Sequence, residues 1–105
     1  MNENVNQATT RIPTPKKHKH EMYAVVDQVL GGSRMNVVCG DGKSRLARIP
    51  GGKKRSIKRI RSGDLVIIRP WDIQDEKADV VLRYRPYQAR ILSKRHLLPS
   101  EIDVF

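Results

Sequence analysis

One short stretch of the chain concentrates the side chains that could do chemistry. Residues 51–64 read GGKKRSIKRIRSGD, with six cationic side chains between Lys53 and Arg61 and no acidic one among them. Such a density of like charge costs stability through self-repulsion unless a polyanion neutralises it. Two isoleucines, Ile57 and Ile60, interrupt the run and are expected to anchor it in an apolar core. The stretch therefore predicts a rigidly presented site for phosphate groups.

The rest of the chain supports a nucleic-acid partner over a loop that merely keeps the protein soluble. The 105 residues carry a formal net charge of +10, and a field of that sign attracts nucleic acid. Arg45, Arg48 and Arg69 fall on adjoining predicted strands and extend the positive patch. If roughly three to five phosphates are neutralised, log affinity should fall with log salt at a slope of roughly −2 to −4. Within the stretch, the expected phosphate contacts are Lys53, Lys54, Arg55, Lys58, Arg59 and Arg61.

Aromatic side chains are the second group that could bind RNA, because unpaired bases stack on exposed rings. Trp71 follows Pro70 in a predicted loop between two strands, a position at the rim where small barrels bind ligands. The alternative is that Trp71 covers the end of the barrel, since tryptophan is usually mostly buried. Both interpretations stay open. Tyr84 and Tyr87 are expected to pack a C-terminal helix on the barrel.

Catalytic and metal chemistry have weaker support. A metal-dependent nuclease is an alternative because four carboxylates cluster in sequence: Asp72, Asp75, Glu76 and Asp79. Such an enzyme needs rigid, convergent carboxylates and preferably a general base, whereas this cluster is mostly on a loop without a nearby histidine. Two histidines, His18 and His20, and the single cysteine, Cys39, do not make a closed metal site. We expect no enzyme activity, metal or cofactor, and a buried Cys39.

The elements that must position these residues are mostly short strands. Alternating apolar residues and turn signals predict strands at 22–30, 35–39, 44–49, 65–69 and 78–84, with Asp41-Gly42 as a hairpin turn. Three strands, a connection of about 14 residues and two more strands match a mainly β OB-fold, a five-stranded Greek-key barrel. An SH3-like barrel is the structural rival, but its connections are more evenly short. After Pro86, a helix with Tyr87, Ile91 and Leu92 on one side is expected to run toward Pro99.

The predicted organisation is a flexible basic tail at 1–20, the barrel at 21–85, and a helix and tail packed on the barrel at 86–105. The tail prediction rests on the near absence of large apolar residues and on the run KKHKH. No apolar run approaches a membrane span, and the N-terminus lacks the apolar region of a secretory signal. These features favour a soluble cytoplasmic protein.

Two long stretches carry a resemblance to a known family. VDQVLGGSRMNVVCGDGKSRLARIPG and SGDLVIIRPWDIQDEKADVVLRY resemble the archaeal and eukaryotic translation initiation factor 1A family, which includes the related bacterial initiation factor 1. The resemblance covers residues 21–98, and it implies an OB-fold with C-terminal helical structure. The long acidic tail of eukaryotic members is not present, which favours the archaeal type.

The resemblance also implies a function. Family members bind the small ribosomal subunit at the aminoacyl-tRNA (decoding) site, where they contact rRNA and a neighbouring ribosomal protein. With other initiation factors they promote binding of initiator tRNA and mRNA, and we expect a monomer that does the same. Many relatives have tryptophan where this chain has Arg59, whose guanidinium can also stack on bases. Carried onto this sequence, the rRNA-facing residues are Gly52, Lys53, Lys54, Arg55, Lys58, Arg59 and Arg61, with Arg45 and Arg48 beside them.

Two further expectations concern partners and rivals. The C-terminal IDVF resembles the apolar end that eukaryotic members offer to the initiation factor 5B-type GTPase, although simple packing on the helix is the alternative. A cold-shock-like RNA chaperone, a general binder of single strands, is the rival function. It would need several exposed aromatic residues on the second and third strands, and MNVVC and SRLARI contain none.

Overall fold

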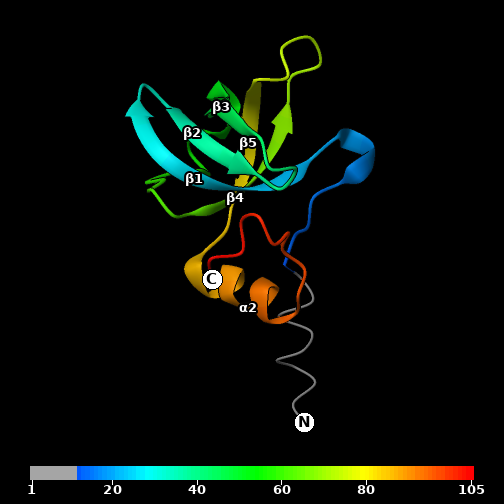
Figure 1. Cartoon of the computed structure of the whole chain (residues 1–105). Helices are drawn as coiled ribbons and strands as arrows, with labels where there is room; N and C mark the ends of the chain where they lie inside the picture. Colours follow the sequence, from blue (N-terminus) through cyan, green and yellow to red (C-terminus); the bar gives the residue numbers. More distant parts are fainter. Residues whose placement is uncertain (1–11) are drawn as a thin grey trace.

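Five strands close into one barrel in the computed structural model, which describes residues 12–105 (Figure 1). The strands are β1 Met22–Gly31, β2 Arg34–Cys39, β3 Ser44–Arg48, β4 Leu65–Pro70 and β5 Lys77–Arg83. Two 3-10 helices, η1 Lys17–Lys19 and η2 Gly51–Lys53, and one α-helix, α2 Pro86–Lys94, complete the elements. Each predicted strand is confirmed, with bounds that differ by at most one residue. Within the described residues, no helix has the length and apolar character needed to cross a bilayer.

The order of the strands around the barrel is β1-β2-β3-β5-β4. The first three form an antiparallel meander, whose second turn has Gly42 at φ +84°, as the Asp41-Gly42 signal predicted. The chain then leaves β3 through residues 49–64 and returns as β4. β5 lies between β3, to which it is parallel, and β4, which also pairs with β1 and so closes the barrel. This arrangement confirms the predicted five-stranded OB-fold.

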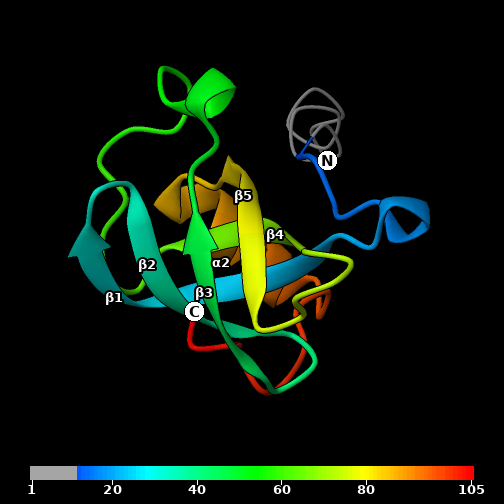
Figure 2. The same ribbon diagram turned by 90° about the horizontal axis from the view of Figure 1, so that it is seen from above.

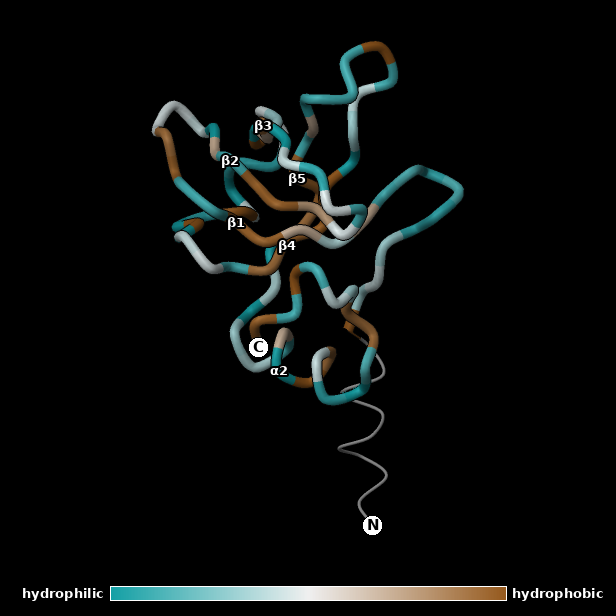
Figure 3. The backbone as a smooth tube through the Cα atoms, viewed as in Figure 1, coloured by the Kyte–Doolittle hydropathy of each residue, from teal (hydrophilic) through white to brown (hydrophobic). Residues whose placement is uncertain are grey.

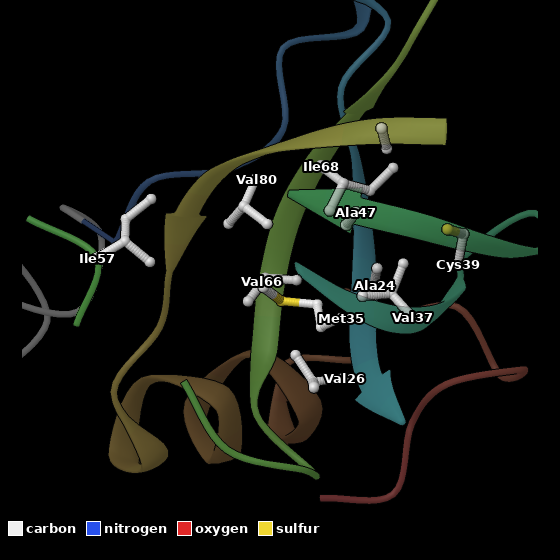
Figure 4. Close-up of a cluster of buried hydrophobic side chains, with 11 residues drawn as sticks. Ala24, Val26, Met35, Val37, Cys39, Ala47, Ile57, Val66, Ile68 and Val80 are labelled. Atoms are coloured by element: carbon white, nitrogen blue, oxygen red, sulfur yellow. The ribbon is translucent and has the colours of Figure 1, made fainter. Parts of the chain in front are cut away.

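The barrel interior is filled by alternate residues of the strands (Figure 4). Met35, Val37 and Cys39 on β2 are at most 1% exposed, as their shared face predicted. Cys39 is thus a small buried hydrophobe, and its burial raises the pKa of the thiol. Apolar residues line the strands, whereas the connecting loops are mainly hydrophilic (Figure 3). The interior cluster is Ala24, Val26, Met35, Val37, Cys39, Ala47, Ile57, Val66, Ile68, Ala78 and Val80.

A second apolar cluster joins the outside of the barrel to α2, which lies beneath it in Figure 1. Tyr84 is 1% exposed and packs here, as predicted. Tyr87 does not, because it is 53% exposed, so its predicted packing role is wrong. The buried residues of α2 are Ala89 and Leu92, and Tyr87 lies about 200° around the helix from Ala89. The cluster comprises Ile12, Tyr23, Leu65, Ile67, Tyr84, Ala89, Leu92, Leu98 and Ile102.

The helix ends earlier than the sequence suggested. α2 stops at Lys94, and His96 adopts a left-handed conformation (φ 58°) that terminates it. The chain then folds back, so that Ile102, which is 2% exposed, joins the second cluster. Val104 and Phe105 remain exposed, at 75% and 36%.

The structure also differs from the prediction ahead of the barrel. The proposed flexible tail covered residues 1–20, of which residues 1–11 lie outside the described part of the chain. Ile12 is buried in the second cluster, and the Tyr84 hydroxyl donates a hydrogen bond to the Pro13 carbonyl. Ile12 and Pro13 therefore attach the N-terminal arm, residues 12–20, to the domain, and the described structure begins ahead of residue 21. A single isoleucine was too weak a signal to predict this from sequence.

Candidate RNA-binding surface

The connection between β3 and β4 forms a cationic loop, defined here as residues 50–63. It projects beyond the barrel on one side, in green at the top of Figure 2. Loop and barrel thus give the molecule a positively charged projection with a defined direction. All six cationic side chains singled out in the sequence belong to exposed residues: Lys53, Lys54, Arg55, Lys58, Arg59 and Arg61.

Apolar and backbone contacts anchor the cationic loop between residues 50 and 60. Ile57 is 4% exposed and belongs to the barrel interior, and Ile60 packs against the same cluster, so the anchors predicted from sequence are confirmed. The amide of Lys53 donates to the Pro50 carbonyl at 2.9 Å, and the amide of Ile57 donates to the Lys53 carbonyl at 2.9 Å. The cationic side chains therefore project from a backbone that is already ordered.

Two residues that sequence reasoning missed hold the backbone at residues 58 and 61. One carboxylate oxygen of Asp64 accepts from Arg83 Nε at 3.0 Å and from the Arg61 amide at 2.9 Å. The other end of the Arg83 guanidinium donates to the Lys58 carbonyl at 3.0 Å. The available sequence signal was an acid three residues after the last of the six bases, but its partner is 19 residues further along the chain.

Arg45, predicted to contact phosphate, is not available for that role. Its side chain is 3% exposed because β3 directs Arg45 and Ala47 inward and Leu46 and Arg48 outward. Its guanidinium donates to both carboxylate oxygens of Asp41, at 3.0 and 2.8 Å, and to Asp75 at 3.0 Å. These hydrogen bonds hold the pKa of the Asp41 carboxyl below its usual range. Arg45 is a buried ion-pair residue that ties together the β2–β3 turn and the β4–β5 loop.

Arg48 and Trp71 form part of a cluster on the outer face of β3 and β5, here called the Trp71 cluster. The guanidinium carbon of Arg48 lies 5.0 Å from the centroid of the Trp71 ring, and Lys77 Nζ lies 5.5 Å from it. Asp79 accepts hydrogen bonds from Trp71 Nε1 at 3.0 Å and from Arg48 Nε at 3.1 Å. The Trp71 ring is half-buried. It is therefore neither fully exposed for base stacking nor fully buried over the end of the barrel, the two alternatives that the sequence left open.

The Trp71 cluster is connected to the start of the cationic loop through Arg48. Arg48 is the last residue of β3, two residues ahead of the cationic loop. Arg69, also exposed, lines a surface hollow with Arg48, Pro70 and Trp71. The region thus combines a cationic projection with an aromatic ring flanked by cations, which suits phosphate and base contacts in RNA.

The acidic cluster considered for a nuclease does not converge. Asp75 forms an ion pair with Arg45, and its Oδ2 lies 3.7 Å from Lys43 Nζ. Asp79 instead forms an ion pair with Arg48 and accepts a hydrogen bond from Trp71. Their charges are therefore directed toward different cations. Within residues 12–105, no group of three or more histidine, cysteine, aspartate or glutamate residues could hold a metal ion.

Comparisons with known proteins show which family this chain resembles. The family described as "Translation initiation factor 1A / IF-1" matches residues 8–104. Translation initiation factor 1A of Picrophilus torridus is 47% identical over 105 residues, which is all of this chain and 96% of that protein. The factor of Thermoplasma acidophilum is 50% identical over 95 residues, covering 90% of this chain and 79% of its own length.

A solved structure supports the fold alone. YjeQ from Thermotoga maritima has a TM-score of 0.51 and 15% identity, covering 62% of this chain and 23% of that one. The family match spans almost the whole chain, and the two curated relatives share about half of their aligned residues with it. On these grounds the chain belongs to the translation initiation factor 1A family.

Proposed function

We propose that this protein is a non-enzymatic initiation factor that binds the small ribosomal subunit at the aminoacyl-tRNA (decoding) site through contacts with rRNA. The observation that carries the proposal is the cationic loop, whose six exposed cations are held to one side of the barrel by buried isoleucines. Membership of the initiation factor 1A family supports the ribosome as the source of the RNA.

The proposed mechanism is steric and electrostatic. The barrel fills the decoding site, and the cationic loop enters among rRNA phosphates, where each neutralised phosphate releases counterions. Trp71 and the guanidinium groups of Arg48 and Arg59 stack on unpaired bases. Elongator tRNA is thereby kept out while initiator tRNA and mRNA bind. Because most contacts are to backbone and RNA shape, sequence preference on free oligonucleotides should be weak.

The proposed partners follow from the same placement. They are the rRNA, a neighbouring ribosomal protein, the initiator tRNA complex and other initiation factors. The exposed apolar pair Val104 and Phe105 supports a contact of the C-terminus with the initiation factor 5B-type GTPase. We propose that the protein acts as a monomer in the cytoplasm.

Co-sedimentation with purified small subunits over a salt series tests the function. We expect the protein to pellet with the subunits, and log affinity to fall with log salt at a slope of roughly −2 to −4. An excess of unstructured single-stranded RNA should fail to displace it, which separates the proposal from a cold-shock-like chaperone. No pelleting at low salt, or complete displacement by the single strand, would refute the proposal.

Trp71 can be tested by its own fluorescence, because it is the only tryptophan in the chain. On binding a short RNA helix with the decoding-site internal loop, we expect its emission to be quenched by a stacked base. Trp71→Ala should weaken binding about tenfold, in line with roughly 1–3 kcal/mol for one stacked base, with little change in salt slope. Tyr87→Ala, which removes an exposed ring on α2, is the control and should bind like wild type. Unchanged emission at saturation would remove Trp71 from the RNA contact.

A further inference from the structure

We propose that Asp64 and Arg83 form a clasp that positions the cationic loop for RNA, so that an acidic residue strengthens binding to a polyanion. The inference rests on the proposed function and adds two positioning residues to it. Neither was among the RNA-binding residues suggested by the sequence. Both side chains are largely withdrawn from solvent, with exposed fractions of 16% for Asp64 and 29% for Arg83.

The clasp holds the backbone at two of the six cationic positions. Arg83 Nη1 reaches the carbonyl of Lys58, while Asp64 accepts the amide of Arg61 and the Nε of the same arginine. Arg83 ends β5, and the amide of Val26 on β1 donates to the Asp64 carbonyl at 2.9 Å. The segment that carries Lys58, Arg59 and Arg61 is therefore attached to two strands of the barrel.

This attachment matters because the cationic side chains of the loop repel one another. Six cations in nine residues repel one another, and a free loop would relieve the repulsion by spreading into many conformations. RNA would then have to order the loop as it binds, and the lost freedom would weaken the complex. A loop held in one conformation avoids that loss. Hydrogen bonds to charged groups, of which the clasp has three, are the stronger kind.

The decisive experiment uses two substitutions with the same effect on net charge. Asp64→Asn removes one negative charge and weakens the clasp. Asp27→Asn removes one negative charge from the neighbouring β1, where the exposed side chain makes no hydrogen bond or ion pair with any residue between 12 and 105. Electrostatics alone predicts that both variants bind RNA more tightly. The clasp predicts that Asp64→Asn binds about three- to tenfold more weakly, whereas Asp27→Asn binds as well as wild type or better.

Binding is measured with small subunits and with the decoding-site RNA helix, at a temperature where thermal melts show every variant folded. The salt slope should be the same for wild type and Asp64→Asn, because no phosphate-contacting cation has been removed. Amide hydrogen exchange supplies a readout without RNA. The amide of Arg61 should exchange faster in Asp64→Asn, while that of Val66 in β4 should not change.

A second variant keeps the inference testable if Asp64→Asn folds poorly. Arg83→Lys preserves the charge, but an ammonium group lacks the planar guanidinium whose separate nitrogens reach Asp64 and Lys58 together. It should therefore also weaken RNA binding and speed hydrogen exchange of the Arg61 amide. Equal or tighter binding by the folded variants, or unchanged exchange, would overturn the clasp. Failure of wild type to bind subunits would instead refute the proposed function, so the two failures are distinguishable.

Discussion

Replacing Lys53, Lys54 and Arg55 together with alanine is expected to lower affinity for small ribosomal subunits by on the order of a hundredfold at about 0.1 M salt. Each phosphate contact contributes roughly 0.7 to 0.9 to the salt slope and is worth somewhat under tenfold at that salt concentration. Losing three contacts should therefore reduce the magnitude of the slope by about 2 to 3. Co-sedimentation across a salt series measures the affinity and the slope together.

The fold should tolerate this change, since all three residues are exposed and the loop is anchored elsewhere by Ile57 and Ile60. A control variant, Arg90→Ala with Lys94→Ala, removes two exposed cations from α2 on the other side of the second cluster. It should lose far less affinity per charge removed. Equal loss per charge in both variants would mean that the whole protein's field, and not the cationic loop, provides the binding.

The strands could be predicted because local patterns determine them. Alternation on residues 35–39 matched a face that is buried in the barrel, and Asp41-Gly42 supplied the turn residue with positive φ that the hairpin needs. The barrel order then followed from one long connection between the third and fourth strands. The strand and turn signals lie within a few residues of the structure that they specify.

The errors arose where distant residues decide the structure. The alternation of β3 turns Arg45 inward, but one of the carboxylates that pairs with its buried charge, Asp75, is 30 residues away in the β4–β5 loop. The attachment of the N-terminal arm depends on Ile12 joining the second apolar cluster and on the Pro13 carbonyl, which accepts a hydrogen bond from Tyr84. A basic residue on a strand and an isolated isoleucine in a polar segment look unremarkable in sequence.

The candidate site shows the same division. The cations of the loop and their isoleucine anchors were evident from residue types alone. Their positioning by Asp64 and Arg83, and the pairing of Trp71 and Arg48 with Asp79, depend on contacts across strands. Sequence therefore predicted which cations of the loop are exposed better than it predicted what holds them in place.

Arg45→Ala is expected to be the most destabilising single change in the polar part of the molecule, at about 2–3 kcal/mol of unfolding free energy near pH 7. Breaking a fully buried ion pair costs roughly 3–5 kcal/mol, but Asp41 and Asp75 are 33% and 59% exposed, so water can partly solvate them after the change. Urea unfolding measures the loss. Arg48→Ala is the matched control on the same strand, and its exposed ion pair should contribute no more than about 1 kcal/mol.

The pH dependence separates the ion pair from simple packing of the arginine stem. Hydrogen bonds from Arg45 lower the folded-state pKa of Asp41, so this stabilisation is fully present above the ordinary aspartate value of about 3.9 and disappears as pH falls through the folded-state pKa. The difference in unfolding free energy between wild type and Arg45→Ala should therefore shrink as pH falls below about 4. A difference that stays constant to about pH 2 would show that the buried stem, and not the paired charge, joins the β2–β3 turn to the β4–β5 loop.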